Sequence, residues 1–306
     1  MKRRSQAMPT PSADAPDARA ELAPDARAEL RRAGAELAAV GIDSPTVEAE
    51  MLLAHVLKVS RPQLLTHGAL TDGQLRRLAE LMSRRAEGIP LQHLTGTAPF
   101  RHIELAVGPG VFIPRPETEL IVDLAREQLA DARLVVDLCA GSGAIALAVA
   151  NEYGSAHVIA VEGSQQAAVW LRRNVAARVA AGDSPIEVII SDIRSPELLI
   201  VEAGTVDVLL CNPPYVPERI RAGLAPEIAH DPDQAVFAGA DGLTLMPAVI
   251  AVAARVLRPG GLLAIEHDDS HGHAVPASLK ASAQWKTVAD HDDLTGRPRF
   301  STAVRL

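Results

Sequence analysis

The sequence VVDLCAGSGA, residues 135–144, reads as an apolar strand, a glycine-rich turn and the start of a helix. Small residues at the turn let the backbone approach a ligand closely, and free N–H groups at a helix start favour an electronegative one. Gly141, Gly143 and Ala146 also fit the loose dinucleotide-binding fingerprint, with Glu162 near the distance expected for a ribose contact. By itself this spacing leaves two interpretations open, a cofactor site and close packing of a helix on a sheet.

Apolar, β-branched runs alternate with helical segments from residue 134 onward. Such alternation predicts a doubly wound, largely parallel sheet, which binds its ligands at the carboxyl ends of its strands. The expected strands are residues 134–138, 157–162, 187–190, 206–211 and 261–266. Helices are expected near residues 144–151, 165–181 and 243–257. Two last runs, residues 285–288 and 300–305, are expected to finish the sheet, where an antiparallel pair is one arrangement.

The chain before this alternation predicts three further segments. Residues 1–25 are expected to be a flexible extension, which contains the first copy of the duplicated octapeptide APDARAEL at residues 15–22 and 23–30. Residues 26–92 have helical periodicity and predict a small helical domain, whose apolar faces should pack internally while the bundle offers a surface for docking a substrate. Residues 93–115 predict a β-hairpin linker, and residues 116–306 the main domain.

Local signals support these segments. Ser44 with Pro45 fits a helix cap and first position, and the segment that begins Thr71-Asp72-Gly73-Gln74 fits a capping box. In the linker, apolar and other residues alternate over 100–113, and the Gly108-Pro109-Gly110 segment is the expected turn.

Composition and net charge restrict the classes of protein to which this chain can belong. The 306 residues are 48% hydrophobic and 22% charged, which is typical of one large globular core with a small second domain. The net charge of −8 counts against a broad basic surface, so no direct nucleic-acid recognition is expected. No apolar run is long enough to cross a bilayer or to form a signal core, so we expect a cytoplasmic protein and no membrane partner. Cys139 and Cys211 are expected to be reduced thiols. We also expect a monomer.

The apolar run 206–211 leads directly into Asn212-Pro213-Pro214-Tyr215, the acceptor turn. Two consecutive prolines fix φ and remove two backbone donors, so the turn offers carbonyl oxygens and an Asn amide without competing N–H groups. The Asn212 side-chain oxygen and the Pro213 carbonyl can accept both hydrogens of a planar NH2 group, and Tyr215 can stack on its flat face. Taken alone, the tetrapeptide favours an ordinary strand-to-loop turn with an Asx contact.

Acidic residues at two neighbouring strand ends complete a pattern around this turn. Glu162 ends the second expected strand, where a carboxylate can bind both ribose hydroxyls. Asp192 follows the third, where it can accept from an adenine amino group, and the fourth strand end is left for the reacting substrate. This order describes a class I S-adenosylmethionine-dependent methyltransferase with a Rossmann-like, mostly parallel sheet.

Three further segments carry a family resemblance: GTAPF at residues 96–100, IPRPETE at residues 113–119 and DLTGR at residues 293–297. With the acceptor turn, they resemble the HemK/PrmC family, the glutamine N5-methyltransferases that modify the Gly-Gly-Gln motif of peptide chain release factors, the proteins of translation termination. The resemblance runs from about residue 26 to the C-terminus. It implies S-adenosylmethionine as the cofactor and release factors as the protein substrate.

The resemblance also implies roles by position. Phe100 and Tyr215 would flank the glutamine amide, and Arg115 and Glu117 would support its pocket. Asn212 would face both cofactor and substrate. The expected catalytic residues are Asn212, Pro213, Pro214 and Tyr215. The residues expected to bind the cofactor, from pattern and resemblance together, are Cys139, Ala140, Gly141, Ser142, Gly143, Glu162, Asp192, Ile193 and Asn212.

The chain departs from the family pattern in places. The family more often has Gly-Thr where this chain has Cys139-Ala140, Asp in place of Glu162, and Glu-Pro in place of Asp231-Pro232. Glu162 still offers a ribose acceptor, so cofactor affinity is expected to shift while the chemistry survives. Residues 266–273 are rich in His and acidic groups, and we expect a solvated loop there rather than a metal site.

Alignment of the reactants is expected to supply most of the catalysis, with Asn212 and Pro213 stabilising the positive charge that develops on the attacking nitrogen. No His or carboxylate base is expected. The main alternative is a nucleic-acid adenine N6 or guanine N2 methyltransferase, whose exocyclic amino group presents the same donors but which should have a basic cleft. A binding module without catalysis and a nicotinamide dehydrogenase are further alternatives.

Overall fold

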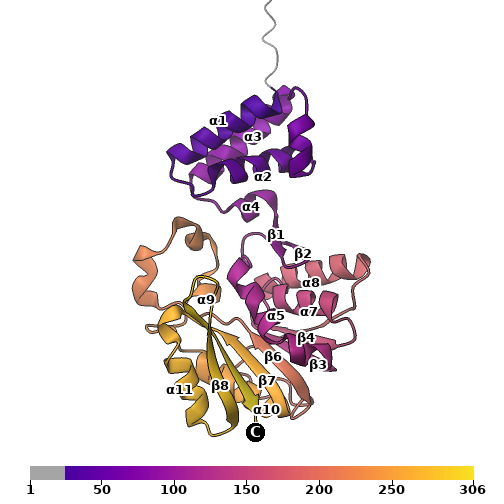
Figure 1. Cartoon of the computed structure of the whole chain (residues 1–306), viewed down its shortest axis with the longest axis vertical. Helices are drawn as coiled ribbons and strands as arrows, with labels where there is room; N and C mark the ends of the chain where they lie inside the picture. Colours follow the sequence, from indigo (N-terminus) through magenta and orange to yellow (C-terminus); the bar gives the residue numbers. More distant parts are fainter. Residues whose placement is uncertain (1–24) are drawn as a thin grey trace, which may run out of the picture. The chain divides into compact units, whose positions relative to one another are not determined.

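The computed structural model describes residues 25–306, which form two compact units, one up to Ser83 and one from Arg84 to Leu306 (Figure 1). The division falls inside a helix, α3, that spans Asp72–Ala86. The expected extension lies outside the described residues, except that Asp25 caps the first helix. The first octapeptide copy is therefore also outside the described part of the chain.

The first unit is helical. It contains α1 (Ala26–Ala39), α2 (Pro45–Leu57), the 3-10 helix η1 (Arg61–Thr66) and most of α3. Its leucines pack internally, as expected, since those with side chains almost entirely buried include Leu37, Leu52, Leu53, Leu64, Leu78 and Leu81. The unit therefore has a core of its own.

The helix starts of this unit follow the local sequence in part. The Asp25 carboxylate accepts the Ala28 N–H at 2.7 Å, and the reciprocal bonds of the expected capping box join Thr71 and Gln74. Pro45 occupies the first turn of α2, but the Ser44 side chain makes no capping hydrogen bond, so that part of the prediction is wrong.

The second unit begins with α4 (Leu91–Thr95) and a hairpin of β1 (Thr97–Phe100) and β2 (Ile103–Ala106). The hairpin turns at Arg101 and His102. The sequence analysis placed this turn at residues 108–110, and that prediction is wrong. Arg101 adopts a positive φ of 51° because partners from elsewhere hold it: its N–H donates to Glu119 and its guanidinium binds Glu152. These contacts are tertiary, so the local pattern does not reveal them.

The glycine at residue 108 has a different purpose from the one predicted. A Cβ on Gly108 would lie 2.5 Å from the Trp170 ring, so this position is small because the ring packs on it. Trp170 also donates its ring N–H to the Pro109 carbonyl at 3.3 Å. The segment therefore anchors the linker to the helix that carries Trp170.

A seven-stranded sheet forms the centre of the second unit, in the order β5-β4-β3-β6-β7-β9-β8. Neighbouring strands are parallel as far as β7, and β9 is antiparallel to both of its neighbours. The expected strands are all present, with β7, β8 and β9 longer than predicted. Their bounds are β3 (Leu134–Leu138), β4 (His157–Glu162), β5 (Glu187–Ile190), β6 (Val206–Cys211), β7 (Leu257–Glu266), β8 (Trp285–Asp292) and β9 (Pro298–Arg305).

Helices cover both faces of this sheet (Figure 1). Because successive strand residues point to opposite faces, Val135 of β3 packs in one core cluster and Val136 in the other. The first cluster contains residues of α5 (Leu120–Leu124), α6 (Arg126–Ala130), α7 (Ala144–Glu152) and α8 (Gln165–Ala180). The second contains residues of α10 (Met246–Val256) and α11 (Ala274–Ala281). Because helices cover both faces of the central strands, side chains on both faces are buried. This explains the nearly continuous apolar runs of the sequence.

Short elements complete the unit: η2 (Pro116–Glu119), η3 (Glu218–Gly223), η4 (Pro226–His230), α9 (Asp233–Val236) and η5 (Asp269–His271). The strand order reverses between β3 and β6, and ligands bind at the carboxyl ends of strands beside such a point. Both cysteines are free thiols, as expected. None of the helices within residues 25–306 has the length and apolar character needed to cross a membrane.

Candidate active site

The glycine-rich turn leaves β3 in an unusual backbone conformation. Cys139, Gly141 and Gly143 all have positive φ, at 63°, 58° and 89°. The Ala140 N–H donates to the Val161 carbonyl at 2.9 Å, which ties the turn to the end of β4. A non-glycine residue with positive φ is strained, so Cys139 occupies a position that suits glycine, the residue more usual in the resembled family.

Gly143 allows close packing of two helices and does not contact the cavity. It precedes the first residue of α7, and a Cβ there would lie 2.6 Å from a Leu171 methyl carbon. It does not line the cavity described below, so the expectation that Gly143 contacts the cofactor is not met. The glycine lets α7 approach α8 closely, as the packing interpretation of this turn proposed.

Glu162 closes the turn from the neighbouring strand. Its Oε2 accepts the Gly141 N–H at 2.8 Å and its Oε1 accepts the Ser164 N–H at 2.6 Å. The side chain lies at the end of β4 and is largely buried. Glu162 therefore fixes two loops of the site, and each oxygen keeps a lone pair for a ribose hydroxyl.

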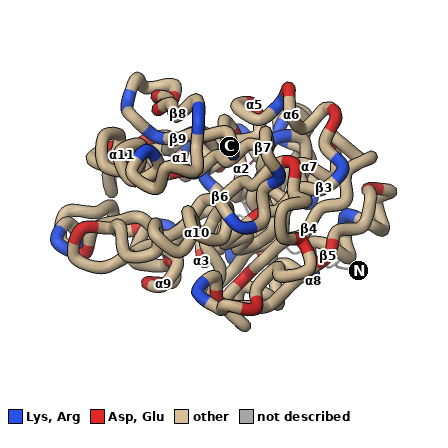
Figure 2. Tube along the Cα trace, turned by 90° about the horizontal axis from the view of Figure 1, so that it is seen from below, with Lys and Arg blue, Asp and Glu red and all other residues tan. Residues whose placement is uncertain are grey.

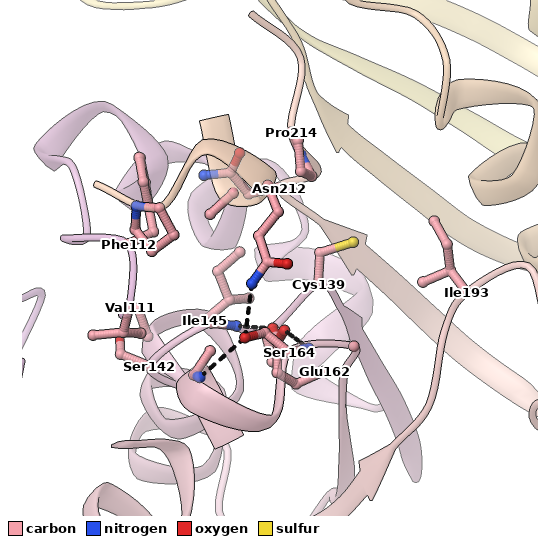
Figure 3. Close-up of a pocket in the computed structure, with 18 of the residues that line it drawn as sticks. Val111, Phe112, Cys139, Ser142, Ile145, Glu162, Ser164, Ile193, Asn212 and Pro214 are labelled. Carbon is pink, nitrogen blue, oxygen red and sulfur yellow. Dashed lines mark hydrogen bonds between the residues drawn. The ribbon is translucent and has the colours of Figure 1, made fainter. Parts of the chain in front are cut away.

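A cavity opens at these strand ends (Figure 3). Its walls come from the glycine-rich turn, the β4 end, the loop after β5 and the acceptor turn. The expected site residues among them are Cys139, Ala140, Gly141, Ser142, Glu162, Asp192, Ile193, Asn212 and Pro214. The sequence analysis missed Val111, Phe112 and Gln234, which also line this cavity. We call it the cofactor cavity.

Asp192 is held by its neighbour. The carboxylate accepts the Arg194 backbone N–H at 2.8 Å and pairs with the Arg194 guanidinium at 2.5 Å. The hydrogen bonds from the Arg194 side chain and backbone lower the pKa of Asp192 to about 2, so it is ionised at neutral pH. An adenine amino group would therefore share this carboxylate with Arg194, a partner that the sequence analysis missed.

The acceptor turn follows β6 as predicted. The Asn212 Nδ2 donates to the Thr118 hydroxyl at 3.1 Å, while Oδ1 accepts no hydrogen bond from the described residues. The Tyr215 hydroxyl donates to Glu266 Oε1 at 2.8 Å, and burial beside that carboxyl raises the pKa of Tyr215 well above its usual value. Asn212 therefore has an unpaired acceptor, and Tyr215 is fixed by its hydroxyl.

A second cavity lies on the Tyr215 side of the turn, and we call it the acceptor cavity. It brings together residues from the segments 113–119, 212–215 and 293–297, which are distant in the sequence. Its lining contains both acidic and basic side chains. The lining residues are Arg115, Glu117, Tyr215, Glu266, Asp293, Thr295, Arg297 and Arg299. Arg115 and Glu117 thus line a cavity that Tyr215 shares, and their expected role as supports of the substrate pocket stays a prediction.

Arg115 also organises the chain around this cavity. Its guanidinium pairs with Asp231, whose other oxygen accepts the Ile113 N–H at 3.1 Å. Burial raises the pKa of Asp231, and the charge of Arg115 opposes that rise. The guanidinium also lies 5.0 Å from the centre of the Phe112 ring. Arg115 therefore links the 113–119 segment to the loop that ends at Pro232.

Two expected site residues lie elsewhere. Phe100 is 0% exposed and packs among apolar residues of the first core cluster, so the structure does not place it beside a substrate. Pro213 is also buried and is not among the residues that line either cavity. The aromatic and proline content of the motifs signals both packing and contact, and the sequence alone does not separate these roles.

The prediction of a solvated loop at residues 266–273 is wrong in part. His267 is fully buried and its Nε2 lies 2.8 Å from Asp290 Oδ1. His271 is also buried, with Nε2 at 2.8 Å from the Asp241 carbonyl. These histidines are partners of specific acceptors. Within residues 25–306 no cluster of His, Cys, Asp or Glu has an arrangement that could hold a metal ion.

Glu266 and Thr118 are the main residues that the sequence analysis did not identify. Glu266 ends β7, and Thr118 lies in η2 within the segment 113–119. The strand-end rule offers a signal for Glu266, because β7 is parallel to β6 and its carboxyl end lies beside the acceptor turn. No comparable local signal distinguishes Thr118.

The strand order, the glycine-rich turn and the acceptor turn at the reversal of the sheet define a class I S-adenosylmethionine-dependent methyltransferase. The PrmC N-terminal domain family matches residues 29–96, and the methyltransferase small domain family matches residues 107–235. The chain is 45% identical over 279 residues to the release factor glutamine methyltransferase of Mycolicibacterium smegmatis, covering 90% of this chain and 96% of that protein.

Two further relatives carry the same name. The Mycobacterium tuberculosis protein is 42% identical over 279 residues, covering 89% of each chain. The Streptomyces coelicolor protein is 43% identical over 277 residues, covering 87% of this chain and 93% of that one. The chain therefore belongs to the release factor glutamine methyltransferase family.

Proposed function

We propose that this chain transfers a methyl group from S-adenosylmethionine to the side-chain amide nitrogen, N5, of the glutamine in the Gly-Gly-Gln motif of peptide chain release factors. The observation that carries the proposal is the place of the acceptor turn. Asn212 lines the cofactor cavity and Tyr215 lines the acceptor cavity, so the turn separates a cofactor from a substrate. Family membership supports the same substrate.

The residues of the cofactor cavity fit S-adenosylmethionine. Glu162 has acceptor capacity for ribose hydroxyls, the 139–142 turn brings backbone close to the ligand, and Ile193 offers an apolar wall. Asp192 is a carboxylate for an adenine amino group. The bound cofactor supplies a methyl group that its sulfonium has already activated. The chain has to hold and orient the second reactant.

Asn212 performs the orienting step in this proposal. Its Nδ2 is held by Thr118, which leaves Oδ1 to accept one hydrogen of the glutamine NH2. The Pro213 backbone carbonyl accepts the other. As the nitrogen gains positive charge, both acceptors bind it more strongly than in the ground state, which lowers the barrier. The methylated nitrogen is acidic and loses its proton afterwards, so no side-chain base takes part.

The acceptor cavity takes the glutamine side chain and the chain around it. Tyr215 provides the flat face, and Arg115 and Glu117 shape the wall. We infer that residues 26–92 dock the release factor, that residues 93–115 link this part to the catalytic domain, and that residues 116–306 form that domain. The proposal also includes a monomer that acts in the cytoplasm.

Charge distribution supports a protein substrate over a nucleic acid. The net charge is −8, and Figure 2 shows Lys and Arg positions interspersed with Asp and Glu along the chain. A nucleic-acid methyltransferase gains affinity from clustered Lys and Arg that neutralise phosphates. The adenine or guanine alternative is therefore not favoured.

Label transfer tests the proposal. The purified chain is incubated with methyl-labelled S-adenosylmethionine and a release factor, beside a factor whose Gly-Gly-Gln glutamine is replaced. Label is expected only in the intact factor. Equal labelling of both factors would move the modified position away from that glutamine, and label in nucleic acid with none in either factor would overturn the proposal.

A further inference from the structure

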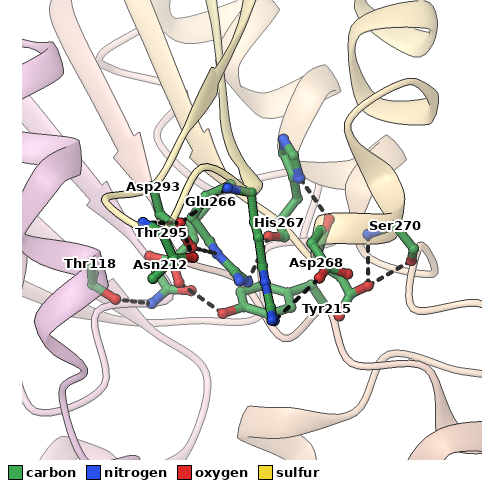
Figure 4. A network of polar contacts seen from close by, with 12 residues as sticks. Thr118, Asn212, Tyr215, Glu266, His267, Asp268, Ser270, Asp293 and Thr295 are labelled. Atoms are coloured by element: carbon green, nitrogen blue, oxygen red, sulfur yellow. Dashed lines mark hydrogen bonds and ion pairs between the residues drawn. The ribbon is translucent and has the colours of Figure 1, made fainter.

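The carboxyl of Glu266 occupies an unusual position beside the acceptor turn (Figure 4). The residue is 1% exposed and ends β7, next to the strand that leads into Asn212. Its Oε1 accepts the Tyr215 hydroxyl at 2.8 Å, and its Oε2 is buried without a hydrogen-bond partner among the described residues. A buried carboxyl with a free oxygen is unfavourable, so its presence in a reactive site indicates a role.

Thr118 connects the same carboxyl to Asn212. Its hydroxyl accepts the Asn212 Nδ2–H at 3.1 Å, and the residue is almost fully buried. The hydroxyl also lies close enough to Glu266 to lower the pKa of its carboxyl, while Oε2 itself has no hydrogen-bond partner among the described residues. One carboxyl thus binds Tyr215 directly and lies near Thr118, which in turn holds Asn212.

We propose that Glu266 is a positioning residue for methyl transfer, which holds Tyr215 and, through Thr118, orients the Asn212 amide so that Oδ1 faces the substrate nitrogen. The inference rests on the proposed function. When Thr118 donates its hydroxyl hydrogen to the carboxylate, its oxygen is left to accept from Asn212 Nδ2. This direction of donors fixes which end of the Asn212 amide is free.

The arrangement requires an ionised carboxyl. A carboxylate accepts hydrogen bonds at both oxygens, whereas a carboxylic acid has one O–H that donates and so competes with the Tyr215 or Thr118 hydroxyl. Protonation of Glu266 therefore releases one of the two links. The charged and titratable groups near Glu266 are Cys211 at the end of β6, Tyr215 after it, Glu117 on η2, Arg299 on β9 and, around the acceptor cavity, Arg115, Asp293 and Arg297.

These surroundings place the change of state near neutral pH. Burial is the largest cause that raises the pKa of Glu266 from 4.5 to about 7, and Glu117 adds to the rise while Tyr215, Thr118 and Arg299 oppose it. Below this pH the carboxyl is protonated. The rate of methyl transfer at saturating substrates is therefore expected to fall as the pH decreases through about 7.

Glu266→Gln tests the inference with little change in shape. The amide keeps an acceptor for Tyr215 but directs an NH2 donor toward Thr118, which removes the preferred orientation of Asn212. We expect kcat to fall by about 10², the scale of a small misplacement in a reactive site. The Kd for S-adenosylmethionine should not change, because Glu266 does not line the cofactor cavity. The decrease of kcat below about pH 7 should disappear, since glutamine does not titrate.

Two more variants separate positioning from general damage. Thr118→Val breaks the link to Asn212 and leaves the carboxyl in place, and it should also lower kcat. The double variant with Glu266→Gln and Thr118→Val should lose less kcat than the product of the two single fold-losses, because both substitutions break the same link to Asn212. Glu187→Gln is the matched control, since this glutamate is the exposed first residue of β5, and it should keep the rate and the pH profile of the unmodified chain.

The outcomes distinguish the inference from the function on which it rests. If the unmodified chain methylates the release-factor glutamine while Glu266→Gln or Thr118→Val retains its kcat and its pH profile, the positioning role of Glu266 is wrong and the proposed function stands. If the unmodified chain binds S-adenosylmethionine but never labels that glutamine, the proposed function itself is wrong.

Discussion

Removal of the Asn212 side chain has a predicted effect that can be worked from the structure. Asn212→Ala deletes Oδ1, the acceptor for one hydrogen of the substrate amide, and Nδ2, which donates to Thr118 at 3.1 Å. The Pro213 carbonyl remains, so one of the two proposed acceptors survives. Loss of one preorganised polar contact in a reactive site lowers kcat by about 10²–10³, or about 2.7–4 kcal/mol. Turnover is expected to fall by that factor.

Cofactor binding should respond much less to the same change. Asn212 forms only one part of a cavity whose other walls come from the 139–142 turn, Glu162 and Ile193. Single-turnover transfer of labelled methyl to a release factor measures the chemical step, and calorimetric titration with S-adenosylmethionine measures binding. A kcat loss with nearly constant affinity indicates an interaction used mainly in the transition state.

Asn151→Ala provides a matched control. Asn151 lies on α7, where its amide donates to Asp183 at 2.9 Å, and it lines neither cavity. Its replacement should leave turnover unchanged. Turnover of Asn212→Ala close to that of this control, with an intact fold, would refute the role given to the Asn212 oxygen.

Three other changes have expected outcomes. Glu162→Ala should weaken S-adenosylmethionine binding by calorimetry and lower the free energy of unfolding by about 1–3 kcal/mol, because two loop N–H groups lose their acceptor; unchanged affinity would contradict this. Cys139→Gly should raise the free energy of unfolding in urea by about 1 kcal/mol, since glycine relieves the positive φ at some cost in chain entropy. Burial raises the pKa of Asp137 from 3.8 to about 8, so the folded state retains a proton that the unfolded state releases, and stability should fall as the pH rises between these values. Asp137→Asn should weaken that dependence in urea titrations across the range, and an unchanged slope would count against the buried neutral acid.

The strands of the catalytic unit could be predicted because both faces of the central sheet are covered. Runs such as residues 206–211 are buried on both faces and are apolar except for Asp207, and the bounds of this run match the observed strand. The carboxyl ends of parallel strands then bring Glu162, Asp192 and Asn212 to one cavity, although the residues are far apart in the sequence. The order and direction of the strands are therefore enough to predict that these three residues lie together.

The rest depends on contacts that no local pattern encodes. The hairpin turns at Arg101 because Glu119 and Glu152 hold this residue in place. The sequence analysis placed the turn at residues 108–110 because glycines are common in turns. Phe100 belongs to a motif but packs in the core. Glu266 gains its position from the pairing of β6 and β7, and its environment from side chains of four separate segments. Such arrangements follow from tertiary packing.

Mass-spectrometric mapping of the methylated product tests the central claim most directly. A release factor is incubated with the chain and S-adenosylmethionine, digested, and fragmented to locate the added methyl group. Our account predicts a single methyl group on the side-chain amide of the Gly-Gly-Gln glutamine, absent when Asn212→Ala replaces the unmodified chain. A methyl group on any other residue of the factor, with that glutamine unmodified, would contradict it.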